Sequence, residues 1–202
     1  MREALNNEEQ KTGSGIKKSP GAVKAAAWEM VKFFILAILI VLPIRIYIAQ
    51  PFIVNGSSMD PTFATGEYLI VDELSYRLGS PERGDVVILR YPRDPSKFFI
   101  KRIIGLPNET IQISGGSITI KGERDPTGFE LKEPYIKFTK NDDLLRKLGD
   151  DEYFVMGDNR AASSDSRAWG PVEEDLIIGR ALLRLFPIAS AKVLPGKYKD
   201  AD

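Results

Sequence analysis

The sequence of 202 residues contains no cysteine and no histidine. Without cysteine, the chain cannot form disulfides, thiolate zinc sites or a cysteine nucleophile. Without histidine, it cannot contain a Ser-His-Asp or Cys-His arrangement. Any serine chemistry in this protein must therefore use another base, which leaves lysine, a carboxylate or tyrosine.

An excess of charge of either sign is also lacking. The 28 lysines and arginines balance the 28 aspartates and glutamates, and the sequence pI is near 6.4. A broad basic face is not indicated, so we expect no nucleic-acid partner. Carboxylate metal sites remain possible, but no stretch has the spacing of a calcium loop or a zinc motif. We therefore expect neither a metal nor an organic cofactor.

One long apolar run follows a polar N-terminal tail of residues 1–27, which we expect to be flexible. The run, "WEMVKFFILAILIVLPIRIYIA" at 28–49, has about the ~20 residues that a helix needs to cross a bilayer. A buried helix of a soluble core is the alternative. However, residues 33–44 contain no polar side chain on any face, which favours a transmembrane signal anchor. A cleaved signal peptide is disfavoured because no small-x-small site follows.

The charges around this run predict its orientation. Five lysines precede its apolar core: Lys11, Lys17, Lys18, Lys24 and Lys32. The positive-inside rule then places the N-terminus in the cytoplasm. We expect a single-pass protein of the plasma membrane, with everything after the anchor outside the cytoplasm.

The remaining sequence has the pattern of a β domain. Short runs rich in Val, Ile, Phe and Tyr, such as "EYLIVDEL", "GDVVILRY" and "EYFVMGDN", alternate with turn clusters. The stretch "TIQISGGSITIKG" predicts a hairpin, because two alternating strands flank two glycines. No β-α alternation is present, so we predict a mostly β, antiparallel domain over 51–196 and a C-terminal tail at 197–202. One or two helical turns are expected at 72–79 and 140–149.

Lys101, in "FFIKRIIG", is the lysine to weigh first as a base. On a strand, Phe99, Lys101 and Ile103 would share one face. Such apolar neighbours disfavour the ammonium form and lower the pKa, and a shift of ~2–3 units would suit a base at mildly alkaline pH. The alternative is a lysine whose stem packs while its head reaches water. Arg102 has similar neighbours, but arginine cannot act as a base.

The stretch "NGSSMDPT", just after the apolar run, offers two adjacent candidate nucleophiles, Ser57 and Ser58. Both could instead be ordinary turn residues, because a glycine precedes them and Asp-Pro follows. The residue pattern alone does not choose between these alternatives.

Four motifs taken in order resemble those of type I signal peptidases, which use a Ser/Lys dyad and form peptidase family S26. They are "NGSSMDPT" after an anchor, "RGDVVILRYP", "FIKRIIGLP" and "GDNRAASSDSRAWG". The resemblance runs from the anchor to "GRALLRLFP". It implies an antiparallel β-sheet peptidase domain of the signal-peptidase type, with one N-terminal transmembrane helix.

The resemblance also implies roles for individual residues. Ser58, directly before the methionine, would be the nucleophile, Lys101 the general base, and Ser163 the residue that orients the lysine. The loop that supports them would contain Asp158, Asn159, Arg160, Asp165, Ser166 and Arg167. The pockets for substrate side chains would involve Val54, Met59, Phe99 and Ile100.

The oxyanion hole is the one place where this sequence departs from part of the family. Some members carry a serine two residues before the nucleophile, whose hydroxyl is a second oxyanion donor. This chain has Gly56 there, so only the Ser58 backbone N–H can be named as a donor. Because one lost donor costs about 10²–10³ in turnover, another group should fill the role.

By resemblance, the substrates are exported preproteins, cleaved after small residues at the −1 and −3 positions through an acyl-enzyme. The partners of this protein would be these preproteins and the lipid bilayer, with the secretion machinery near by. Two other functions remain to be weighed. One is a self-cleaving Ser/Lys repressor peptidase, which would be soluble and carry a DNA-binding module. The other is a membrane-anchored binding protein without activity.

Overall fold

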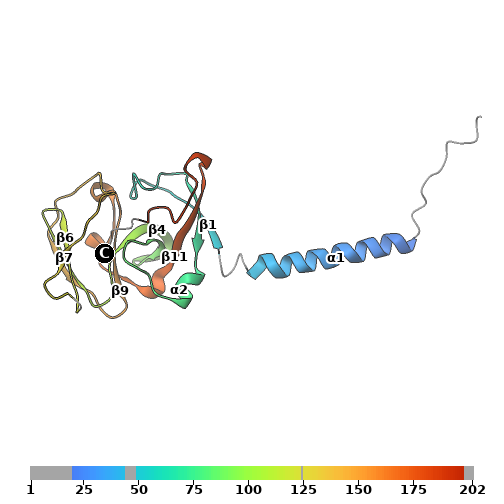
Figure 1. The fold of residues 1–202 in the computed structure, drawn as a ribbon, viewed down its shortest axis with the longest axis horizontal. Helices are drawn as coiled ribbons and strands as arrows, with labels where there is room; N and C mark the ends of the chain where they lie inside the picture. The colour runs from blue at the N-terminus through green and yellow to red at the C-terminus, as the bar shows by residue number, and fades with distance from the viewer. Residues whose placement is uncertain (1–19, 44–48, 124, 198–202) are drawn as a thin grey trace, which may run out of the picture. The chain divides into compact units, whose positions relative to one another are not determined.

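A computed structural model of the chain describes residues 20–43, 49–123 and 125–197 (Figure 1). They divide into two units. The first contains the helix α1 (Pro20–Pro43), and the second is rich in β-strands and contains all the other elements.

The helix α1 is long and apolar enough to cross a membrane. Its window Lys24–Leu42 has a mean hydropathy of 2.2, and none of this window is buried within the structure. Residues 20–27, which we expected in the polar tail, are helical, since an alanine-rich stretch favours a helix. The helix ends at Pro43, whereas we expected the span to continue to residue 49; residues 44–48 lie outside the described part.

The β-rich unit consists of two sheets in which every ladder is antiparallel, so the predicted fold class is confirmed. The larger sheet has the order β1-β2-β11-β3-β4-β9-β10, and β12 pairs with β11. Its strands are β1 (Ala49–Ile53), β2 (Tyr68–Asp72), β3 (Val86–Tyr91), β4 (Asp94–Gly105), β9 (Glu152–Met156), β10 (Val172–Glu173), β11 (Ile177–Phe186) and β12 (Lys192–Val193). The smaller sheet has the order β7-β6-β5-β8, with β5 (Thr110–Ser114), β6 (Ser117–Lys121), β7 (Phe129–Glu130) and β8 (Leu144–Lys147).

The predicted hairpin is confirmed as β5 and β6. Ser114 pairs with Ser117, and the two glycines between them have φ angles of 56° and 90°. Positive φ at both central positions is the requirement of the two-residue turn that matches strand twist, and glycine meets it without steric cost.

The helical elements of this unit are short. They are α2 (Leu74–Leu78), α3 (Ser166–Trp169) and the 3-10 turns η2 (Arg160–Ala162), η3 (Glu174–Leu176) and η4 (Ile188–Ser190). The helical turn expected within 72–79 is therefore confirmed. The one expected within 140–149 is wrong, because Leu144–Lys147 forms the strand β8 and pairs with β5. A four-residue helix would be marginal, whereas pairing satisfies the backbone groups of an otherwise open sheet edge.

The strands β3 and β4 lie between two core clusters. Ile88 and Ile100 belong to one cluster, whereas Leu89 and Ile103 belong to another, with Phe99 packed against it. The predicted alternation of faces along β4 is thus confirmed. Lys101 is on the same face as Phe99 and Ile103. Its strand, β4, lies between β3 and β9 in the larger sheet.

Candidate active site

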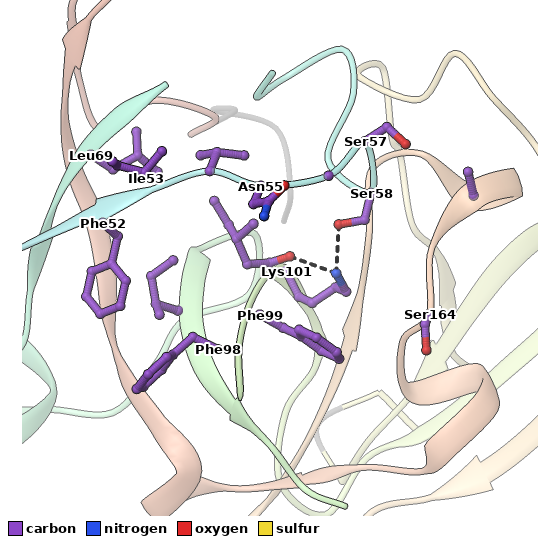
Figure 2. Close-up of a pocket in the computed structure, with 15 residues that line it drawn as sticks. Phe52, Ile53, Asn55, Ser57, Ser58, Leu69, Phe98, Phe99, Lys101 and Ser164 are labelled. Atoms are coloured by element: carbon purple, nitrogen blue, oxygen red, sulfur yellow. Dashed lines mark hydrogen bonds between the residues drawn. The ribbon is translucent and has the colours of Figure 1, made fainter. Parts of the chain in front are cut away.

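Ser58 and Lys101 meet at the mouth of a cavity in the β-rich unit (Figure 2). Ser58 belongs to the loop between β1 and β2, and Lys101 projects from β4. The Lys101 Nζ lies 2.8 Å from the Ser58 Oγ, within hydrogen-bond distance. The two side chains therefore have the separation needed for direct proton transfer from a nucleophile to its base.

The Lys101 amine is buried among apolar groups. Lys101 is only 3% exposed, and its Nζ lies 5.2 Å from the centre of the Phe99 ring. Burial lowers the pKa of Lys101 from 10.5 to about 8, although the negative charges of Asp165 and Asp158 oppose this shift. Nζ also donates to the Ile100 carbonyl at 2.9 Å. The amine is thus held in place and is partly neutral at mildly alkaline pH.

Backbone contacts from the 157–167 segment hold the loop that carries the two serines. Asn159 donates its backbone N–H to the Ser58 carbonyl at 3.0 Å, and its side-chain amide donates to the Ser57 carbonyl at 3.1 Å. Figure 2 shows the Ser57 hydroxyl pointing away from Lys101, whereas the Ser58 hydroxyl points toward it. The geometry therefore favours Ser58 over Ser57 as the nucleophile.

A buried ion pair lies directly behind this site. Arg102 and Asp158 are both completely buried, with Arg102 Nη2 2.6 Å from Asp158 Oδ2. The same carboxylate oxygen accepts a hydrogen bond of 2.5 Å from the Thr62 hydroxyl, four residues after Ser58. Arg102 also donates to the carbonyls of Gly84 and Gly196, at 2.8 and 2.6 Å. The residue next to the lysine thus connects β4 to the serine loop.

The two arginines of the 157–167 segment also form ion pairs. Arg167 donates to Asp165 at 2.8 Å and to Asp142 at 2.6 Å, and Arg160 pairs with Glu133. Burial by itself would raise the pKa of Asp165, but hydrogen bonds and charge from Arg167 hold it below its ordinary value.

Other hydrogen bonds fix the backbone of this segment. Asp165 accepts from the Gly157 backbone N–H, and the Ser166 hydroxyl accepts from the Val155 N–H. Sequence reasoning did not find Thr62, Glu133 or Asp142, because they come from separate loops without a motif.

Ser163, expected to orient the lysine, makes no hydrogen bond to it. Its buried hydroxyl has no partner with hydrogen-bond geometry among the described residues. It lies near enough to Asp165 to help stabilise the charged form of that carboxylate. A Cβ atom added at Gly157 would collide with both the Ser163 hydroxyl and the Ser58 carbonyl. Ser163 and the serine loop therefore approach the same point of the backbone.

The cavity beside the two side chains has a volume of about 320 Å³. Its walls are mostly apolar and come from β1, β2, β3 and β4, from the loop that carries the two serines, and from the 157–167 segment. Of the four expected pocket residues, Val54, Phe99 and Ile100 line it; Met59 does not, and is buried in the core cluster behind. In the described ranges, no group of three or more acidic residues could hold a metal ion.

Comparison with known proteins identifies the family of this chain. The family described as "Signal peptidase, peptidase S26" matches residues 27–186. A signal peptidase I of Bacillus amyloliquefaciens is 36% identical over 89% of this chain and 95% of its own. A probable signal peptidase I-2 of Synechocystis is 34% identical over 82% of this chain and 76% of its own.

A solved structure of a signal peptidase I from Enterococcus faecalis is 28% identical. It covers 50% of this chain and 97% of its own, with a TM-score of 0.43. The family match covers well over half of the chain, and the curated relatives are matched along most of their lengths. On these grounds, the chain belongs to the signal peptidase family S26 and is an enzyme of the signal peptidase I type.

Proposed function

We propose that this enzyme removes N-terminal signal peptides by an acyl-enzyme mechanism in which Ser58 is the nucleophile and Lys101 the general base. Signal peptide removal follows from the family. The observation that supports the residue-level mechanism is the 2.8 Å contact between Lys101 Nζ and Ser58 Oγ, made by a lysine that is 3% exposed. A lysine with an ordinary pKa would be protonated and could not accept the serine proton.

Acylation begins when the Ser58 Oγ attacks the carbonyl carbon of the scissile bond and the neutral Lys101 amine takes the hydroxyl proton. The oxyanion that forms accepts from the Ser58 backbone N–H, which has no other hydrogen-bond partner among the described residues. The carbon–nitrogen bond breaks, and Lys101 returns its proton to the leaving amine. Lys101 then takes a proton from water as that water attacks the ester carbonyl. The bond between the acyl carbon and the Ser58 Oγ breaks, and Lys101 returns the proton to this oxygen.

Substrate selection would take place in the apolar cavity. Val54 and Ile100 are buried, and together with Phe99 they form part of its wall. Apolar pockets of limited volume accept alanine-sized side chains, which agrees with cleavage after small residues at the −1 and −3 positions. Among the described residues, Lys101 is the one charged side chain that lines this cavity.

Ser163 is proposed to orient the lysine during the reaction. A protonated lysine has three N–H donors, and the contacts to Ser58 and Ile100 use two of them. The buried Ser163 hydroxyl lies near Asp165 but has no partner with hydrogen-bond geometry among the described residues, so its acceptor lone pairs are available. The third Lys101 donor would form a hydrogen bond to it when the lysine carries the proton taken from Ser58.

The anchor is proposed to hold the site at the membrane surface. Lysines before the apolar core of the span favour a cytoplasmic N-terminus, so the β-rich unit would face outward from the plasma membrane. A preprotein still embedded by its signal peptide would then meet the site at high effective concentration, near the secretion machinery.

The test uses the full chain in liposomes with a preprotein substrate, and the N-terminus of the product is sequenced. Ser58→Ala and Lys101→Met should each abolish cleavage, whereas Ser57→Ala should retain it. Processing by Ser58→Ala, with loss in Ser57→Ala, would reverse the serine assignment. Retained cleavage by Lys101→Met would remove the base from the mechanism, and no cleavage by the wild-type chain would favour a binding protein.

A further inference from the structure

The oxyanion hole of the proposed mechanism lacks an obvious second donor. The Ser58 backbone N–H supplies one hydrogen bond, but acyl-transfer sites ordinarily use two or more donors. Gly56 has no side chain, and its backbone N–H is already donated to the Thr65 hydroxyl at 3.1 Å. The Thr65 hydroxyl in turn donates to the Gly56 carbonyl at 3.0 Å, so its own proton is also used.

The cavity lining contains few other polar side chains. They are Asn55, Ser57, Ser58, Lys101 and Ser164. Ser58 and Lys101 are occupied by the reaction itself. Figure 2 shows the hydroxyls of Ser57 and Ser164 pointing away from the Ser58–Lys101 pair. Asn55 is the remaining candidate donor on the cavity wall.

Asn55 has the chemistry and the position that a donor needs. It is exposed, lines the cavity, and its carboxamide points into the cavity in Figure 2. In the part of the chain that the structure describes, this carboxamide makes no hydrogen bond, so both of its N–H groups are free. The buried Val54 directly precedes it, and most of the other residues that line the cavity are apolar.

The nucleophile loop brings Asn55 and Ser58 to the same side of the cavity. Gly56 has a φ of +99°, so the chain turns between the two residues. The Val54 N–H donates to the Glu67 carbonyl, and the Gly66 N–H donates to the Val54 carbonyl. These two hydrogen bonds fix the backbone where it enters the turn. The backbone that carries Asn55 is therefore held in place before a substrate arrives.

We infer that the Asn55 carboxamide is the second oxyanion donor and takes the place of the hydroxyl that a serine at position 56 would supply. The inference rests on the proposed function, because the oxyanion forms only when Ser58 attacks a carbonyl. Its ligand is the tetrahedral oxyanion at the scissile carbon of the preprotein. Asn55 is thus a catalytic residue that acts on the transition state more strongly than on the bound substrate.

The experiment compares full-length Asn55→Ala and Asn55→Asp with the wild type on a preprotein in liposomes. Asn55→Ala should lower kcat by about 10²–10³ and leave KM within a few fold, since the lost interaction is made in the transition state. Asn55→Asp has the same shape but replaces the donor with a negative charge, so its kcat should fall further. Asn141→Ala, an exposed asparagine outside the cavity lining, is the matched control and should retain full activity.

A second measurement separates oxyanion stabilisation from ordinary substrate binding. A peptide aldehyde forms a hemiacetal with the serine, with an oxygen in the oxyanion position, whereas the corresponding peptide alcohol cannot. Asn55→Ala should weaken binding of the aldehyde by at least tenfold and leave binding of the alcohol unchanged. Equal weakening of both, or a rise in KM alone, would overturn the inference and make Asn55 a substrate-binding residue.

Ser58→Ala, measured in parallel, distinguishes the two levels of failure. An active Ser58→Ala would overturn the proposed function itself. An inactive Ser58→Ala together with an Asn55→Ala of normal kcat would overturn only this inference, and a backbone donor such as the Ser57 N–H would then be the second partner. Because Asn55 is exposed and outside the core clusters, its variants should keep the wild-type unfolding temperature.

Discussion

Burial of the Lys101 side chain is what prepares it to act as the base in the proposed mechanism. At pH 8, a lysine of pKa 10.5 is neutral in only ~1 of 300 molecules, whereas one of pKa about 8 is neutral in half of them. The apolar side chains around β4 produce this change by excluding water from the amine. The same exclusion is unfavourable for folding, because the ammonium form loses its hydration.

We expect Lys101→Met to stabilise the protein while it abolishes cleavage. Below pH 8, both the folded and the unfolded lysine are protonated, so the folded state bears the full desolvation penalty. The difference of 10.5 − 8 corresponds to an upper limit of about 3 kcal/mol. Between pH 8 and 10.5, the unfolded chain binds more protons, so the wild type gains stability as pH rises and the advantage of the variant disappears.

Urea unfolding in detergent at pH 7 and pH 10.5 would measure this difference. Lys147→Met, at an exposed position of β8, is the matched control and should show no comparable dependence on pH. A Lys101→Met variant less stable than the wild type at pH 7 would contradict the proposed desolvation of the amine.

At the scale of elements, the 157–167 segment acts as a clamp on the nucleophile loop. Asn159 holds the carbonyls of Ser57 and Ser58, and Asp158 holds Thr62 beyond them. The clamp is itself fixed by the fully buried Arg102–Asp158 pair. Such pairs add little net stability, but removal of one partner leaves an unpaired buried charge. Their effect here is to fix the loop's position relative to β4.

Gly157→Ala should disrupt this clamp. The added methyl group would collide with the Ser58 carbonyl and the Ser163 hydroxyl, and backbone atoms cannot rotate away as a flexible side chain can. A displacement of the nucleophile by ~1 Å costs about 10² in turnover. We therefore expect kcat to fall by roughly that factor. Preprotein cleavage assays on the purified variant would measure it.

Gly149→Ala provides the matched control, since its added methyl group would make only ordinary contacts of 3.5 Å with Glu152. Normal turnover in Gly157→Ala would show that the loop tolerates a larger separation than the structure indicates.

At the scale of the whole molecule, the chain combines an apolar helix with a β-rich unit that has its own cores. Three clusters of buried apolar residues lie entirely within the β-rich unit. No described residue of the helix α1 belongs to these clusters. The stability of the catalytic unit and the membrane affinity of the helix are therefore separate properties.

Deletion of residues 1–48 should separate two activities. Cleavage of a short soluble peptide should stay within a few fold of the full-length value, because the site lies within the β-rich unit. Cleavage of a preprotein held in liposomes should fall by at least tenfold, since the effective concentration supplied by the anchor is lost. Parallel kcat/KM measurements on both substrates would test this. An equal fall on both would indicate that the helix supports the fold of the catalytic unit.

The local sequence determined a large part of this protein. The absence of histidine restricted the base to a few residue types, and alternation along β4 placed Lys101 on an apolar face. Two glycines between alternating strands fixed the β5–β6 hairpin, and the motif order identified the family. These features depend on residues close together in the chain, so their physical consequences can be worked out from the sequence.

Contacts between distant segments were decided only by the tertiary structure. Ser58 and Asn159 are about a hundred residues apart, and neither sequence context shows that they touch. The sequence presents Arg102 as a neighbour of the lysine that cannot act as a base. In the fold, its buried ion pair with Asp158 connects β4 to the 157–167 segment. Asn55 had no assigned role until the cavity showed which polar groups were free. A side chain's burial and partners depend on the whole packed fold, and residue spacing along the chain does not contain that information.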